Sequence, residues 1–327
     1  VQFDNKNRMA AKLANVAGCT PQELVITRNT TEALDLVISG QDWKSGDEAV
    51  YALQDYGAMQ DMFEQIANRY GVKLIKVSVP NLPLSDEEVV SLYEKALTSR
   101  TRLLMVSHMV NITGHILPIA KISAMAHRKG VPVLVDGAHA FGHFEYRLSE
   151  LGCDYYGTSL HKWMSVPLGA GFLYVKKEKI PTLWPLIADN RKDLSDILRL
   201  NHIGTHPCAT DLAIEDALDF YQKIGGVLKE QRLRYLQNYW TSKIQNYPKI
   251  VLNTPTDPSR SCGIANVGIA GLDPNEMAKI LLKEFGIFTV GINYANVIGC
   301  RICPNVYTTL PELDQFVAAL KTMADRA

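Results

Sequence analysis

The sequence predicts an α/β fold: a three-layer large domain, with helices on both faces of a mostly parallel sheet, and a smaller α+β domain after it. Short apolar runs alternate with helical patterns along the first half of the chain. Runs such as residues 131–135 are rich in β-branched side chains, as expected for strands buried on both faces. A length of 327 residues also exceeds what one hydrophobic core usually holds.

The N-terminal half contains the regular alternation. Apolar spacing predicts helices at residues 6–17, 29–37, 85–97 and 119–129, with one more ending at Tyr70. Between them, short strands are expected at residues 24–27, 48–51, 73–77, 103–107, 131–135, 153–156 and 172–175. Ser85 and Glu88 have the spacing of a capping box. This order favours a doubly wound, mostly parallel sheet.

The pattern weakens after Val175, where residues 180–200 predict loops and short helices. Amphipathic helices follow at residues 210–224 and 227–244. A strand–helix–strand pattern then covers residues 264–269, 274–284 and 288–290, and a helix at 310–323 closes the chain. We therefore predict a large domain of residues 1–218 and a small domain of residues 219–327, with the hinge in the helix at 210–224.

Composition excludes several classes of function. The 34 basic and 34 acidic residues are mixed along the chain, which argues against nucleic acid or an anionic membrane as a partner. No apolar stretch reaches the length of a transmembrane helix. Six cysteines are too few for a disulfide scaffold. The Cys300-x-x-Cys303 pair lacks a second pair or a nearby histidine, so no metal site is predicted.

The start of the sequence is relevant to the cellular compartment of the protein. The chain starts at Val1, and residues from about Asn5 already have a helical pattern. We interpret this as a trimmed N-terminus, so a native segment that carries any targeting signal would lie outside this sequence. The compartment is therefore unknown, with the cytoplasm as the default.

Lys162 is the centre of the functional prediction. It stands between His161 and Trp163, on what the sequence predicts to be a short loop after small polar residues. Desolvation among such neighbours favours the neutral amine, which can attack a carbonyl group. The alternative is an ordinary loop lysine whose charged end reaches solvent.

Asp136 decides between these alternatives. It follows the buried strand at residues 131–135, and ligands of open α/β sheets bind at the carboxyl ends of strands. A carboxylate there and a lysine 26 residues later suit pyridoxal 5′-phosphate. The carboxylate keeps the pyridine nitrogen protonated, so that the ring withdraws electrons, and the lysine forms a Schiff base.

The segments Asp136-Gly-Ala-His-Ala140 and Ser159-Leu-His-Lys162 resemble the class V aminotransferase family of fold-type I pyridoxal phosphate enzymes. Within it they are most similar to the isopenicillin N epimerase-like branch. The resemblance covers nearly the whole chain. It implies an aminotransferase or epimerase type of enzyme that acts on the amino group or α-carbon of an amino acid through a Lys162 Schiff base.

The resemblance also implies a phosphate site for the cofactor. Its residues would be Thr30, Thr31, Ser159 and His161, together with Gly204 and Thr205 of a neighbouring subunit. Thr30 and Thr31 also open a helix, whose free N–H groups and dipole favour an anion. Plain N-capping is the alternative for the two threonines. The contribution of Gly204 and Thr205 implies a homodimer with shared active sites.

Four further residues match family positions around the ring and the substrate. Tyr56 would stack on the pyridine ring, and His139, which we group with Lys162 as catalytic, would lie against the ring near its phenolic oxygen. Asn111 would contact that oxygen or the substrate carboxylate, and Arg301 would bind the α-carboxylate, a bidentate task. The alternatives are a core tyrosine, a structural histidine, a turn asparagine and a structural arginine.

The reaction remains open at this point. With Lys162 as the base that removes the α-proton, epimerisation, transamination and β-elimination are all possible outcomes. Family desulfurases carry a nucleophilic cysteine on a loop before the arginine; residues 291–298 have none, and Cys300 is interpreted as structural.

Other classes stay as alternatives. A β-lyase or desulfurase-like enzyme and a cofactor-binding protein without catalysis both remain. A nicotinamide enzyme is set aside, because no Gly-x-Gly-x-x-Gly follows the first strand. No residue in the sequence identifies the substrate.

Overall fold

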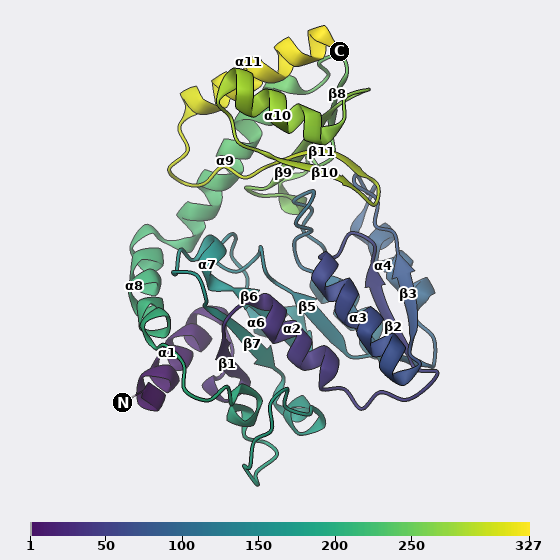
Figure 1. The fold of residues 1–327 in the computed structure, drawn as a ribbon, viewed down its shortest axis with the longest axis vertical. Coiled ribbons are helices and arrows are strands. Elements are labelled where there is room, and N and C mark those ends of the chain that lie inside the picture. Colours follow the sequence, from purple (N-terminus) through teal and green to yellow (C-terminus); the bar gives the residue numbers. More distant parts are fainter. Residues whose placement is uncertain (1) are drawn as a thin grey trace.

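The computed structural model describes residues 2–327 and contains, in that part of the chain, two sheets with helices around them (Figure 1). The larger sheet has the spatial order β1-β7-β6-β5-β4-β2-β3. Its strands are β1 (Leu24–Thr27), β2 (Glu48–Ala52), β3 (Lys73–Val77), β4 (Thr101–Ser107), β5 (Val133–Asp136), β6 (Tyr155–Ser159) and β7 (Gly171–Val175).

Strands β3, β2, β4, β5 and β6 run parallel to their neighbours, whereas β7 is antiparallel to β6 and β1 is antiparallel to β7. From β2 the chain first goes to β3 on one side and then to β4 on the other. That reversal creates a crevice at the carboxyl ends of β2 and β4, where open α/β sheets bind ligands.

Helices cover both faces of the large sheet, as three layers require. One face packs against α1 (Gln2–Ala17), α4 (Asp86–Ala96), α5 (Ile119–Arg128) and α8 (Ala209–Ile224). The other packs against α2 (Thr30–Ser39) and α3 (Gly57–Tyr70). Short helical turns complete this part: η1 (Pro21–Glu23), α6 (Leu148–Leu151), α7 (Leu160–Trp163), η2 (Lys177–Thr182) and η3 (Ile197–Asn201).

Strand β4 shows why the sequence folds into layers. Its side chains alternate between the two faces, so Leu104 and Val106 join the core under α4 and α5, while Leu103 and Met105 join the core under α2 and α3. Both faces are buried, which explains the nearly continuous apolar run in the sequence.

The smaller sheet is antiparallel, with the order β10-β11-β9-β8. Its strands are β8 (Ile250–Leu252), β9 (Ala265–Ile269), β10 (Val290–Tyr294) and β11 (Val297–Ile302). Helices α9 (Gly226–Ile244), α10 (Pro274–Phe285) and α11 (Leu310–Arg326) pack against it, and η4 (Pro258–Arg260) precedes β9. In Figure 1 this part lies at the end of the molecule opposite the N-terminus.

The predicted fold class is confirmed: a three-layer domain with a mostly parallel sheet precedes a smaller α+β part. The division after residue 218 falls inside α8 and stays a prediction. In the described chain, helix α8 packs against α1, whereas α9 packs against α11. None of the helices within residues 2–327 is both long and apolar enough to cross a membrane.

Three local predictions were wrong. Lys162 lies on the one-turn helix α7 and not on a loop. The strand expected at residues 288–290 is β10, which starts at Val290 and is mostly exposed, so its sequence carries little apolar pattern. Ser85 caps α4 by accepting from the Glu88 N–H, but the Glu88 carboxylate accepts from the Leu84 N–H, so no capping box forms.

Candidate active site

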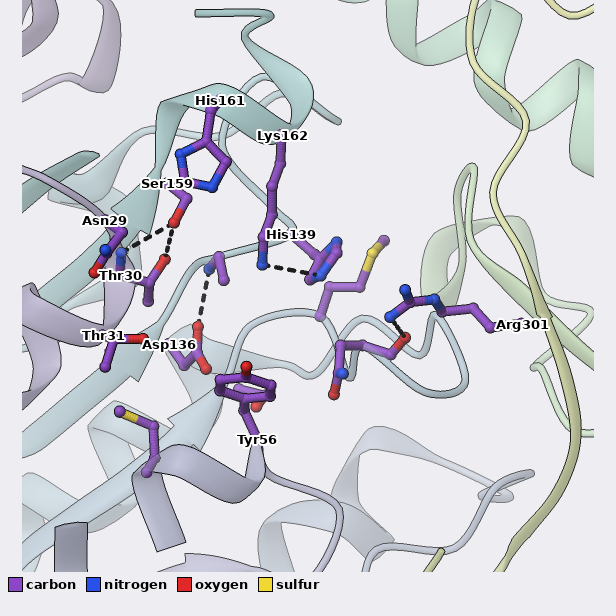
Figure 2. Close-up of a pocket in the computed structure, with 15 residues that line it drawn as sticks. Asn29, Thr30, Thr31, Tyr56, Asp136, His139, Ser159, His161, Lys162 and Arg301 are labelled. Atoms are coloured by element: carbon purple, nitrogen blue, oxygen red, sulfur yellow. Dashed lines mark hydrogen bonds between the residues drawn. The ribbon is translucent and has the colours of Figure 1, made fainter. Parts of the chain in front are cut away.

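A cavity of about 550 Å³ lies at the carboxyl ends of the parallel strands, beside the small sheet (Figure 2). Its lining residues are Asn29, Thr30, Thr31, Tyr56, Met59, Ser107, Met109, Asn111, Asp136, Ala138, His139, Ser159, His161, Lys162 and Arg301.

The topology explains why these residues meet. Tyr56 follows β2, Asn111 follows β4, Asp136 ends β5, and Lys162 follows β6. Parallel strands place their carboxyl ends at one edge of the sheet, so segments far apart in sequence converge there. Arg301 enters from the other side, on β11 of the small sheet.

Lys162 points into the cavity, with Nζ 3.1 Å from Nε2 of His139 (Figure 2). Burial lowers its pKa and outweighs the opposing effect of the Asp136 carboxylate. The amine is therefore easier to deprotonate than an exposed lysine amine, which favours a nucleophile or a base.

Asp136 lies in the floor of the same cavity and is almost entirely buried. Its Oδ1 accepts a hydrogen bond from the Ala138 N–H at 2.9 Å. Burial raises the pKa of this carboxyl group, and the Ala138 N–H and the charge of Lys162 oppose that shift. A cationic partner would stabilise such a buried carboxylate, because a buried charge without a partner is costly.

The N-terminus of α2 meets the end of β6 at one side of the cavity. The Thr30 N–H donates to Oγ of Ser159 at 2.9 Å, and the two hydroxyl oxygens are 2.6 Å apart. Nδ1 of His161 is buried there and makes no hydrogen bond to any described residue. A helix N-terminus lined by hydroxyl groups and an imidazole suits an anionic group such as phosphate.

Tyr56 and Arg301 lie on the other side of the cavity. The Tyr56 side chain is half-exposed, with its ring near Asp136 in Figure 2. Nη1 of Arg301 donates to the Asn111 carbonyl at 3.4 Å, and Nε of Arg301 is buried without a partner among the described residues. An incompletely paired guanidinium facing a cavity suits a carboxylate ligand.

The structure brings together ten of the residues that the sequence singled out: Thr30, Thr31, Tyr56, Asn111, Asp136, His139, Ser159, His161, Lys162 and Arg301. Gly204 and Thr205 are exposed and do not line the cavity of the described chain. Their predicted role requires a second subunit, and it stays a prediction.

Sequence reasoning missed two features. Trp163 donates its indole N–H to His139, and its position next to Lys162 could have indicated that contact. Cys303 lies close enough to Lys162 and Arg301 to influence the pKa of Lys162. Its spacing from Arg301 differs from the family pattern, so no motif marked it as a site residue.

Gly137 holds Asp136 in place by close contact between strands. Its N–H donates to the Gly157 carbonyl at 2.8 Å, and an added Cβ would lie 2.1 Å from the ring of Tyr156. We expect Gly137→Ala to displace that ring and to lower the free energy of unfolding by about 1–3 kcal/mol, as overpacking does. Chemical denaturation measures this loss.

Gly57→Ala is the matched control. Gly57 opens α3, and no described heavy atom outside its own chain neighbours lies within 4 Å of the position of an added Cβ. Alanine there should leave the denaturation midpoint nearly unchanged. Equal midpoints for the two variants would contradict the steric argument.

Comparison with known proteins agrees with this geometry. The sequence profile of the aminotransferase class-V family matches residues 4–298, so the chain belongs to this family. The protein is thus an enzyme of the class V group, and its cofactor is pyridoxal 5′-phosphate, as the sequence predicted.

Curated relatives fall into two groups. The chain is 30% identical over 328 residues to the isopenicillin N epimerase of Streptomyces clavuligerus, covering 95% of this chain and 82% of that protein. It is also 27% identical over 276 residues to a probable cysteine desulfurase of Halalkalibacterium halodurans, covering 80% of this chain and 65% of the relative. Both groups of relatives are consistent with the family assignment, but their names describe different reactions.

Solved structures share the fold. The apo cysteine desulfurase of Thermococcus onnurineus NA1 has a TM-score of 0.87 at 23% identity and covers 100% of this chain and 85% of that one. A K223A mutant of C-DES, described with glycine covalently linked to the cofactor, also has a TM-score of 0.87, at 23% identity and 98% and 86% coverage.

The residues of the cavity fit this cofactor. The partnerless Nδ1 of His161 and the hydroxyl groups at the start of α2 suit its phosphate, and the buried carboxyl group of Asp136 suits a cationic ring nitrogen. Among the described residues, no group of three or more His, Cys, Asp or Glu side chains could hold a metal ion.

Proposed function

We propose that this enzyme removes the α-proton of an amino acid substrate and that its reaction is of the epimerase or aminotransferase type. The observation that carries the proposal is one cavity in which the Lys162 amine, the Asp136 carboxyl group and the Arg301 guanidinium all face the same space. The cofactor, when bound, supplies an electron-withdrawing ring that stabilises negative charge on the α-carbon.

Lys162 would hold the cofactor covalently and then act as the base at the α-carbon. Burial lowers the pKa of its amine, so more of it is neutral at neutral pH than of an exposed lysine. Nε2 of His139, at 3.1 Å, keeps Nζ directed into the cavity. A base is most effective when its pKa lies near the working pH.

Other residues would bind and orient. Thr30, Thr31, Ser159 and His161 surround the anion-binding end, and Tyr56 offers a ring face for stacking. Asp136 would keep the ring nitrogen protonated. These assignments rest on the cavity geometry together with the family resemblance.

Arg301 would bind the substrate α-carboxylate. It reaches the cavity from the small sheet, so binding a carboxylate there would connect the two parts of the chain. We expect Arg301→Lys to raise KM about tenfold or more with a smaller change in kcat, because lysine cannot form the bidentate pair. Steady-state kinetics of the two proteins measure this difference, and an unchanged KM would contradict the assignment.

A homodimer with shared sites is part of the proposal. Gly204 and Thr205 are exposed and lie outside the cavity of their own chain, as residues that reach into a neighbouring site must. Gly204 has a φ of +71°, which marks a tight turn suited to a close backbone approach. Sedimentation at several protein concentrations tests the assembly.

A desulfurase or β-lyase is the second candidate. Cys303 supports it, because its thiol lies near both Lys162 and Arg301. Cys303 is exposed and comes two residues after Arg301, whereas the nucleophilic cysteine of family desulfurases precedes the arginine. Cys300 is fully buried in β11, where its thiol faces the Pro274 carbonyl. The thiols therefore favour the first candidate.

A panel of L- and D-amino acids, mixed with the loaded enzyme in heavy water, tests the proposal. Exchange of the α-proton seen by NMR supports it, and the products then separate the candidates. Inversion detected by chiral chromatography means an epimerase, and a 2-oxo acid formed with an amino acceptor means an aminotransferase. From cysteine, alanine with sulfide in the presence of a thiol reductant means a desulfurase, and pyruvate with sulfide and ammonia means a β-lyase. No exchange with any amino acid would overturn the proposal in favour of a cofactor-binding protein without catalysis.

A further inference from the structure

The imidazole of His139 lies between Lys162 and the indole of Trp163. Nε2 of His139 is 3.1 Å from Nζ of Lys162, and the indole N–H of Trp163 donates to Nδ1 at 3.3 Å. Figure 2 shows the first of these contacts inside the cavity. An indole nitrogen is only a donor, so Nδ1 of His139 must be an acceptor.

This contact determines where the imidazole carries its proton. Burial, together with the positive charges of Lys162 and Arg301, lowers the pKa of His139 well below its usual range, so the ring is neutral. A neutral imidazole has one N–H group. Since Nδ1 accepts from Trp163, that N–H is at Nε2 and faces Lys162. An ammonium group has no lone pair, so only the neutral amine can accept this hydrogen bond.

We propose that Trp163 is a positioning residue that holds His139 as its Nε2–H tautomer and thereby favours the uncharged amine of Lys162. The inference deepens the proposed function and rests on it for the role of Lys162. It concerns a hydrogen bond within the chain, however, so it can be tested without substrate turnover.

The surroundings hold the indole in the orientation that this role needs. Trp163 is buried, and its ring stacks on His143 with centroids 3.6 Å apart and an angle of 25° between the planes. The His143 Nδ1–H donates to the His139 carbonyl, and the Gly263 N–H donates to Nε2 of His143, each at 2.8 Å. Nζ of Lys229 donates to the Trp163 carbonyl. These contacts therefore hold both the indole ring of Trp163 and the backbone of His139 in place.

The charges around Lys162 act in both directions. Asp136, at the end of β5, and the thiol of Cys303, after β11, favour the ammonium form, whereas Arg301 on β11 opposes it. His161, the preceding residue on α7, is neutral because burial lowers its pKa. Burial of the amine is the largest influence. The donor on His139 adds to it, because an ammonium group facing an N–H would be repelled.

Trp163→Phe separates this role from simple packing. Phenylalanine keeps an aromatic ring against His143 but lacks the N–H donor. His139 can then place its proton on Nδ1 and offer the Nε2 lone pair to an ammonium group. We therefore expect the midpoint of Lys162 deprotonation to rise by about one pH unit, since a hydrogen bond to a charged group has that magnitude.

Two measurements on the full chain without cofactor report the tautomer of His139 and the midpoint of Lys162 deprotonation. Nitrogen-15 NMR with labelled histidine identifies the protonated ring nitrogen, and a His139→Gln spectrum assigns the signal. The rate at which an amine-reactive reagent modifies Lys162, followed by peptide mass spectrometry across a pH series, gives the midpoint. The unmutated chain should show the Nε2–H tautomer, and Trp163→Phe a mixture with a raised midpoint.

Trp43→Phe is the matched control. Trp43 is also buried, and its indole N–H donates to the Ile38 carbonyl at 2.7 Å, outside the cavity. This variant should leave the tautomer and the midpoint unchanged. A Nδ1–H tautomer in the unmutated chain would overturn the inference, and so would an unshifted midpoint in folded Trp163→Phe. If Trp163→Phe does not fold, the tautomer of His139 in the unmutated chain decides whether the inference holds. The α-proton exchange experiment tests the proposed function separately, so a negative result there would not change the tautomer result.

Discussion

Replacing Lys162 by alanine should lower turnover by on the order of 10⁴-fold, because one change removes both the proposed covalent attachment of the cofactor and the proposed base. After borohydride treatment of the loaded protein, mass spectrometry should find a pyridoxyl group on the peptide that carries residue 162 of the unmutated chain only. The Lys162 amine lies inside the cavity, and burial lowers its pKa. We therefore expect that an exposed lysine cannot take over its role.

Lys6→Ala serves as the control for the Lys162 variant. Burial also lowers the pKa of Lys6, which lies on α1 and bonds to Asn201 outside the cavity. Its loss should leave turnover and borohydride labelling intact. If Lys162→Ala retained the label or more than about a tenth of the turnover, another amine would be the attachment site.

Asp136→Asn should lower turnover by about 10²- to 10³-fold, since it removes one partner of the buried charge pair that we propose with the ring nitrogen. Asparagine keeps the size of the side chain and can still accept from the Ala138 N–H, so the fold should survive. Cofactor affinity should fall as well, which titration of the cofactor-free protein followed by visible absorbance would measure.

A control for this change is Asp154→Asn. Asp154 is equally buried but precedes β6 at the opposite edge of the sheet, where it accepts from His127 and from the Val133 N–H. This variant should lose stability without a change in cofactor affinity. If the Asp136→Asn enzyme had the same cofactor affinity and turnover as the unmutated enzyme, the proposed role of Asp136 would be wrong.

The sequence by itself determined the fold class and singled out most of the residues proposed to act in the cavity. Strands such as β4 and β5 are buried on both faces, so their apolar runs are visible without a structure. Asp136 ends β5 and Lys162 comes three residues after β6, and the carboxyl ends of strands are where ligands bind. The family assignment and the cofactor followed from these same segments and are confirmed.

Only the tertiary structure decided which residues meet. The entry of Arg301 from the small sheet depends on how the two sheets pack, and no local pattern encodes that. Strand β10 was misplaced because it is mostly exposed at the edge of its sheet, where burial imposes no pattern. The hydrogen bond from Trp163 to His139 joins residues on separate segments, and whether it forms depends on the orientation of one indole ring. Distances and angles of this kind arise from packing, which the order of residues does not display.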